Sequence, residues 1–155
     1  MARVWVPTLL VAGLVGMLAA SLVGVPALVA RADTDPIKER RENRKEVGDL
    51  AKQIKAVVDA GGPAASVVEP ARKIVALEAP FEKLFPPGSD QGDTKALPAV
   101  WSDRKGFDDA SHNLVTQATA LADTAAAGKS PDEVKTAFGN MGKACGGCHN
   151  TYRAK

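Results

Sequence analysis

The pattern that most limits the fold of this chain is a helical repeat of apolar residues in four successive segments. Apolar side chains recur at spacings of three and four over about residues 36–60, 64–85, 101–127 and from residue 130 onward. Residues that share one face of a helix recur with this period, whereas a strand alternates. No segment predicts a convincing strand. The sequence therefore predicts an all-α protein, an antiparallel four-helix bundle.

Glycine and proline mark the ends of these segments. A Gly-Gly-Pro sequence at residues 61–63 ends the first helix, and Gly128 is expected to end the third. Pro70 and Pro80 are expected to kink or shorten the second helix, because proline cannot donate the helical hydrogen bond. Residues 86–98 are dense in turn-forming residues and predict one long loop.

The fourth helix carries the two cysteines of the chain. Ser130 and Glu133 predict a capping box at its start. Counted along this helix, Cys145 and Cys148 continue the apolar face at helical spacing, and His149 follows at the edge of that face. Both cysteines are therefore expected to point into the bundle.

The first 32 residues predict a secretory signal peptide. Arg3 precedes a long apolar run over residues 4–30, and residues 30–32 form an Ala-Arg-Ala cleavage pattern. An uncleaved membrane anchor is the alternative, because the apolar run is long enough to span a bilayer. Either reading places the folded domain, residues 33–155, outside the cytoplasm.

Removal of this leader changes the charge of the chain. The full sequence has 20 Lys and Arg against 18 Asp and Glu, and two of the arginines lie in the leader. The mature chain is thus expected to carry equal numbers of positive and negative side chains. This balance gives no basis for a nucleic-acid partner.

Several chemistries use two cysteines and a histidine at this spacing. A redox dithiol expects strands around it, and none is predicted. A zinc site needs a fourth ligand, and the other histidine of the chain is the distant His112. A disulfide between Cys145 and Cys148 remains an alternative, because exported proteins use disulfides.

The segment Cys145-Gly-Gly-Cys148-His149 has the C-x-x-C-H spacing of c-type haem attachment. Two thiols about one helical turn apart can add to the two vinyl groups of one porphyrin. The next residue then offers an imidazole to the iron as an axial ligand. Together with the predicted export and the inward-facing cysteines, this spacing predicts one covalently bound haem c per chain.

The first helix places two arginines, Arg40 and Arg44, on its apolar face. A guanidinium group there is costly unless an anion meets it. Two haem propionates would be such anions, and arginine pairs well with carboxylates. The alternative is that this face frays near the start of the helix and both arginines reach water.

These features together resemble one family. GKACGGCHNTYR at the end of a four-helix chain, with KLFPPGSDQGDTKALPAVW upstream, resembles the class II c-type cytochromes, which include cytochrome c′ and its low-spin, methionine-ligated relatives. The resemblance implies that Cys145 and Cys148 are thioether anchors and that His149 is the proximal iron ligand. It also implies that Arg40 contacts a propionate and that Arg153 lies beside the proximal haem face.

The sequence departs from the low-spin relatives at one position. Those proteins carry a methionine four residues after the arginine of the first helix, and this chain has Arg44 there. Met141 lies on the haem-bearing helix itself, on the wrong side. Because a protonated guanidinium has no lone pair to give to iron, we expect an iron without a strong sixth ligand. Arg44 would then donate hydrogen bonds to a bound ligand or turn toward a propionate.

The predicted function is that of a periplasmic monohaem electron carrier with redox partner proteins. The alternative is a haem protein that binds nitric oxide or carbon monoxide in the manner of cytochrome c′, which the missing methionine favours. An enzyme is not expected: a peroxidase needs distal acid–base groups, and the histidine candidate, His112, lies off the apolar face of its helix. The resemblance also suggests a homodimer formed through the first two helices.

Overall fold

A computed structural model describes residues 35–155 of the chain. The predicted signal peptide, residues 1–32, lies outside the described residues, so its cleavage and the domain boundary stay predictions. The described part contains four long helices, one short helix and one 3₁₀ turn: α1 (Pro36–Asp59), α2 (Ala65–Glu78), η1 (Phe81–Leu84), α3 (Ala99–Ser102), α4 (Arg104–Ala126) and α5 (Pro131–Tyr152). Within residues 35–155 the only β-type pairing is an isolated bridge between Ala96 and Arg153.

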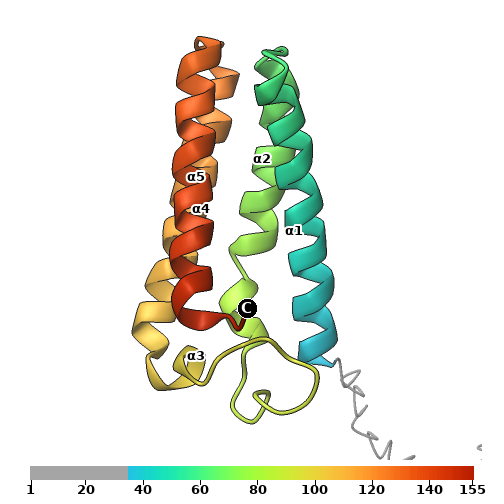
Figure 1. The fold of residues 1–155 in the computed structure, drawn as a ribbon, viewed down its shortest axis with the longest axis vertical. Coiled ribbons are helices and arrows are strands. Elements are labelled where there is room, and N and C mark those ends of the chain that lie inside the picture. Colours follow the sequence, from blue (N-terminus) through green and yellow to red (C-terminus); the bar gives the residue numbers. More distant parts are fainter. Residues whose placement is uncertain (1–34) are drawn as a thin grey trace, which may run out of the picture. The chain divides into compact units, whose positions relative to one another are not determined.

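The four long helices form the predicted bundle, and successive long helices run in opposite directions (Figure 1). Helix α1 packs against α2, α2 against α4, and α4 against α5. Their inward faces build one apolar core, whose largest fully buried side chains are Ile54, Val67, Ile74, Leu121 and Met141. The helical period of the sequence therefore predicted the fold class correctly.

The second helix is shorter than its sequence pattern predicts. Helix α2 ends at Glu78 instead of continuing to residue 85. Pro80 has no N–H for the next helical hydrogen bond, so the chain leaves the helix and continues as η1. Pro70 is accommodated within α2, near its start. This break turns Phe81 and Phe85 into a separate aromatic cluster.

The third helix also begins differently from the prediction. Residues 99–102 form the short helix α3, and α4 starts only at Arg104. Asp103 separates them and caps α4, because its side chain accepts a hydrogen bond from the Gly106 amide at 3.2 Å. The Tyr152 hydroxyl donates to the same carboxylate at 2.7 Å. A side chain at position 106 would overlap both groups, so it would displace the Asp103 carboxylate and the Tyr152 hydroxyl from this contact.

The aromatic cluster fills the end of the bundle where α5 finishes. It consists of Phe81, Phe85, Val100, Phe107 and Tyr152. The rings of Phe85 and Phe107 meet edge to face, with centroids 4.8 Å apart. Cys148 packs against this cluster, whereas Cys145 packs against the main core. The two cysteines therefore lie where the two apolar clusters adjoin.

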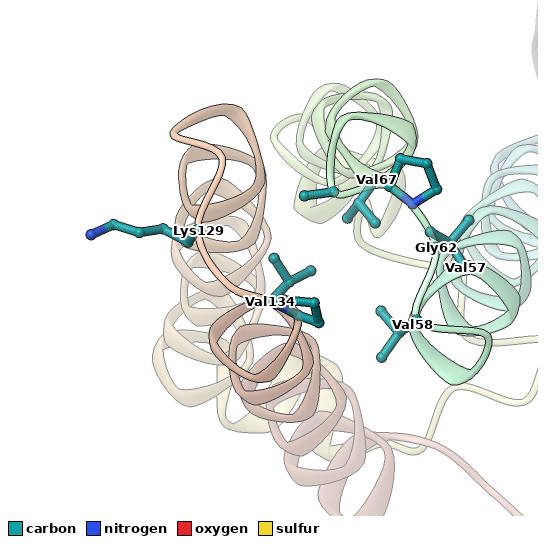
Figure 2. A pocket seen from close by; sticks show the side chains of 10 residues that line it. Val57, Val58, Gly62, Val67, Lys129 and Val134 are labelled. Carbon is teal, nitrogen blue, oxygen red and sulfur yellow. The ribbon is translucent and has the colours of Figure 1, made fainter.

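The opposite end of the bundle is closed by two tight connections. Gly61 and Gly128 follow α1 and α4 with φ of 61° and 62°, a left-handed conformation that favours glycine. The two connections leave a hollow of about 420 Å³ between them (Figure 2). Its wall is mostly apolar, formed by Val57, Val58, Val67 and Val134 with Lys129 at one side.

The start of α5 offers a test of local stability. Ser130 Oγ accepts from the Glu133 amide at 3.3 Å, and the Glu133 carboxylate accepts from the Ser130 amide at 3.0 Å. This is the predicted capping box. Replacing Ser130 with alanine is expected to lower the free energy of unfolding by about 1 kcal/mol, because the Glu133 amide loses its acceptor. Denaturant titration measures the change, and the exposed Thr136→Ala variant on the same helix is the control. Equal effects of both variants would contradict the assigned role of the cap.

Candidate functional site

A cavity of about 470 Å³ lies at the end of the bundle that holds the aromatic cluster. A cavity of this size is within the range that holds a cofactor-sized ligand, about 300–1,000 Å³. All six residues singled out from the sequence line it: Arg40, Arg44, Cys145, Cys148, His149 and Arg153. The wall also includes aromatic and aliphatic side chains, among them Phe81, Phe85, Val100, Phe107 and Leu114.

Helix α5 presents both cysteines to this cavity. Cys145 and Cys148 are half-buried free thiols, so the alternative of a disulfide between them does not describe this structure. A side chain added at Gly146 or Gly147 would meet no atom within 4 Å, so there is open space beside the motif. Among residues 35–155 no three His, Cys, Asp or Glu side chains gather as a metal site. The donor set thus fits a group that uses both thiols and one imidazole.

Burial controls the acidity of these thiols. Desolvation, with a smaller contribution from the negative charge of Glu78, raises the pKa of Cys148 to about 11. The pKa of Cys145 is raised by the same two causes. Both side chains are therefore thiols at neutral pH, and a buried thiol is a poor metal ligand and a slow nucleophile. Capture of a vinyl group would remove this titration by converting each thiol into a thioether.

His149 stands at the open edge of the cavity, near the end of α5. Desolvation against the cavity wall lowers the pKa of its imidazole, and the positive charges of Arg153 and Arg44 lower it further. A lowered pKa favours the neutral imidazole at pH 7, which is the form that binds iron. The electrostatics of the cavity therefore agree with an axial-ligand role.

Arg40 is buried, with 4% of its surface exposed. Its guanidinium donates to the Leu84 carbonyl at 3.0 Å and to the Ser89 hydroxyl and carbonyl at 2.9 and 2.8 Å. The idea that the start of the first helix frays and leaves Arg40 in water is therefore wrong. No carboxylate within residues 35–155 pairs with Arg40, and burial lowers its pKa. A buried cation without an anion fits a cavity whose ligand brings carboxylates.

Arg153 follows α5 and is held by main-chain pairing. The Leu97 amide donates to the Tyr152 carbonyl at 2.9 Å, and the Ala154 amide donates to the Lys95 carbonyl at 2.8 Å. These bonds tie the end of the chain to the long loop and place the exposed Arg153 side chain at the cavity rim.

Arg44 makes contacts that the sequence analysis did not foresee. Its Nη2 donates to Glu78 Oε2 at 2.5 Å, and Glu78 Oε1 accepts from the Ser111 hydroxyl at 2.9 Å. Glu78 and Ser111 are buried polar residues on α2 and α4. The missed signal was the position of Glu78, four residues after Ile74 on the apolar face of its helix. A buried position for an acidic residue requires a cationic partner.

Other candidates lie away from this cavity. Met141 is buried in the main core and does not line it. His112 is exposed and lies 3.2 Å from Glu82, which agrees with the expectation of a surface histidine. Trp101 packs against the Phe85 ring, and its indole N–H donates to the Pro86 carbonyl at 3.2 Å.

A bundle of four helices with a C-terminal C-x-x-C-H segment at a cofactor-sized cavity defines a haem protein of the class II c-type cytochromes. Residues 35–153 match the family described as Cytochrome C′. The cytochrome c′ of Rhodopseudomonas palustris is 36% identical over 139 residues, which cover 88% of this chain and 93% of that protein. The chain therefore belongs to the cytochrome c′ family, as the resemblance in its sequence predicted.

Solved structures of the same family show the same fold. A cytochrome c′ with ligand-controlled dimer dissociation superposes with a TM-score of 0.72 at 33% identity, covering 78% of this chain and 95% of that one. The nitric oxide complex of a variant cytochrome c′ from Alcaligenes xylosoxidans gives a TM-score of 0.70 at 29% identity, covering 78% and 94%. Membership of this family implies covalently bound haem c, and the cavity described above fits it.

Proposed function

We propose that this chain is a monohaem c-type cytochrome whose iron is held by His149 and keeps its sixth position open for a small ligand. Cys145 and Cys148 would anchor the haem, Arg40 would contact a propionate, and Arg153 would lie beside the proximal haem face. A bound haem supplies an iron that cycles between the ferrous and ferric states and accepts one further ligand. The observation that carries the proposal is that the described cavity wall contains no methionine and no histidine besides His149.

The two lysines of the cavity wall already have other partners, and Lys95 donates to the Lys155 carbonyl at 3.3 Å. Lys45 donates to Asp49 at 3.0 Å, and this hydrogen bond raises its pKa. A protonated amine has no lone pair to offer to iron. Ligands such as nitric oxide or carbon monoxide are therefore the first candidates, and the relative from Alcaligenes xylosoxidans in complex with nitric oxide supports this choice.

Electron transfer is the second candidate function. The cavity is bordered by exposed residues, including His149 and Arg153, so an edge of the haem would lie close to solvent. An edge near solvent shortens the path to a redox partner protein. An open iron still exchanges electrons, so the two functions are compatible. Neither requires catalytic turnover, and no enzyme activity is proposed.

The cellular location and the oligomeric state of the protein are inferred from the predicted signal peptide and from the relatives. None of the helices within residues 35–155 has the length and apolarity needed to cross a bilayer. We infer export to the periplasm from the predicted signal peptide, with membrane attachment through residues 1–32 as the alternative. The relative with ligand-controlled dimer dissociation supports testing for a homodimer.

Absorption spectra of the purified haem protein test this proposal. We expect a high-spin spectrum in the oxidised and reduced states, and a clear change when carbon monoxide is added to the reduced protein. A low-spin spectrum that carbon monoxide leaves unchanged would contradict the open iron. A colourless protein, made in cells that attach haem, would contradict the haem assignment itself.

A further inference from the structure

The guanidinium of Arg44 is held in place from three directions. Its Nε and Nη2 donate to Asn43 Oδ1 at 2.9 and 2.5 Å, and Nη2 also donates to Glu78 Oε2. The Cζ atom lies 3.4 Å from the centroid of the Phe81 ring, a stacking contact. Asn43 is fixed in turn, because its amide donates to the Leu77 carbonyl at 2.8 Å. The orientation of this guanidinium is therefore set before any ligand arrives.

Glu78 is the strongest of these anchors. Only 3% of its side chain is exposed, and Ser111 on α4 holds the second carboxylate oxygen. An ion pair with a buried and hydrogen-bonded partner has a defined geometry, whereas a pair between two exposed side chains seldom does. Glu78 and Ser111 therefore position Arg44.

One nitrogen of Arg44 is left without a partner. Nη1 makes no hydrogen bond with any residue from 35 to 155, whereas Nε and Nη2 are both used. The side chain lines the cavity and is 30% exposed. Two N–H donors on a fixed guanidinium are thus available at the cavity wall. A purely structural ion pair would not need to keep them there.

The charge of the cavity wall favours an anion even though Glu78 is present. Two carboxylates, Glu78 and Asp93, line the cavity together with six cationic side chains: Arg40, Arg41, Arg44, Lys45, Lys95 and Arg153. The two propionates of one haem would balance only part of this excess. The wall would stay positive, and a positive cavity with low-dielectric walls concentrates small anions.

Arg44 and the proposed proximal ligand come from different helices. His149 comes from α5 and Arg44 from α1, and these two helices stand apart at the end of the bundle where α5 finishes (Figure 1). A planar group bound to His149 turns its second face away from the imidazole. Residues of the cavity wall that come from other helices, Arg44 among them, would meet that second face.

We propose that Arg44 makes the open iron position selective for small inorganic anions, donating from Nη1 to the bound anion while Glu78 and Ser111 position its guanidinium. This inference rests on the proposed open iron. A charge-assisted hydrogen bond strengthens binding of an anion such as fluoride, whereas a neutral, weakly accepting ligand such as carbon monoxide gains little.

Fluoride binding to the oxidised haem protein tests the proposal, with carbon monoxide binding to the reduced protein measured alongside. Arg44→Leu is combined with Glu78→Gln so that no buried carboxylate is left unpaired. The double variant is expected to bind fluoride about tenfold more weakly than Glu78→Gln alone, with carbon monoxide affinity changed by less than about twofold. Arg44→Lys, in the otherwise unchanged chain, is also expected to weaken fluoride binding, because an amine lacks the fork that bonds Glu78 and the ligand together.

Arg41→Leu is the matched control. Arg41 lines the same cavity and loses the same charge, but its side chain is exposed and already paired with Asp93. If fluoride affinity fell as much in this control as in the Arg44 variants, the proposal would be overturned. The loss would then come from the positive charge of the cavity as a whole and not from a hydrogen bond by Arg44. Unchanged fluoride affinity in Arg44→Lys would contradict the proposed hydrogen bond from Arg44 to the bound fluoride. Carbon monoxide binding without fluoride binding in the unaltered protein would overturn this inference alone, whereas absence of both would overturn the open iron as well.

Discussion

Replacing both Cys145 and Cys148 with alanine is expected to abolish covalent haem attachment, and each single replacement is expected to leave at most one thioether. The two thiols project from α5 into one cavity, and each half-buried sulfur can reach one vinyl group at most. Haem that is only ligated to His149 leaves the protein when acid protonates the imidazole, whereas a thioether survives. Extraction with acidified acetone, followed by intact-protein mass, measures the covalent fraction.

Gly142→Ala is the control for these variants. Gly142 lies on the same helix, is exposed, and has room for a methyl group. It is expected to retain haem fully. A double cysteine variant that still carries haem mass after extraction would show that the attachment site has been misassigned.

Exchanging Arg44 for methionine, together with Glu78→Gln, is expected to convert the haem to a mainly low-spin form. Methionine would stand four residues after Arg40, at the offset that the low-spin class II cytochromes use for their sixth ligand. A thioether sulfur is neutral and has a lone pair, so it can close the position that a guanidinium leaves open. Absorption and paramagnetic resonance spectra measure the change, and carbon monoxide binding should weaken about tenfold or more, because the sulfur competes for the iron.

The Glu78→Gln substitution separates the effect of Arg44→Met on iron ligation from its effect on stability. In the single Arg44→Met variant the Glu78 carboxylate stays buried with Ser111 as its remaining partner. We expect the free energy of unfolding of this single variant to be about 2 kcal/mol lower than that of the double variant. Lys52→Met, on the exposed face of α1, is the control for both measurements. A spectrum that remains high-spin in the double variant would place residue 44 out of reach of the iron.

The grouping of the proposed haem-anchor residues at one cavity could be predicted from sequence because its determinants are local. Cys145, Cys148 and His149 belong to one helix, so their spacing alone sets which face they share. The capping box at Ser130 and the stop at Gly128 were predicted for the same reason. For the second helix the sequence left two outcomes at Pro80, a kink or an earlier end, and the structure shows the earlier end.

The cavity residues from other helices were harder to predict. Arg40 was placed on an apolar face, but its burial depends on the long loop, which brings Ser89 and Thr94 against it. Glu78 was missed because an acidic residue at the end of a helix is ordinarily exposed to solvent. Its role follows only from the neighbours that the bundle supplies.

The sequence by itself determined a four-helix chain with a C-terminal C-x-x-C-H segment and an arginine where the low-spin relatives have methionine. These features depend on the helical period, on capping residues and on the side-chain chemistry of single positions. Tertiary structure alone decided that Arg44, Glu78 and Ser111 form one partly buried hydrogen-bonded chain across α1, α2 and α4. The physical reason is that contacts between helices depend on how each helix is rotated and shifted against its neighbours, and the packing of the whole core sets both.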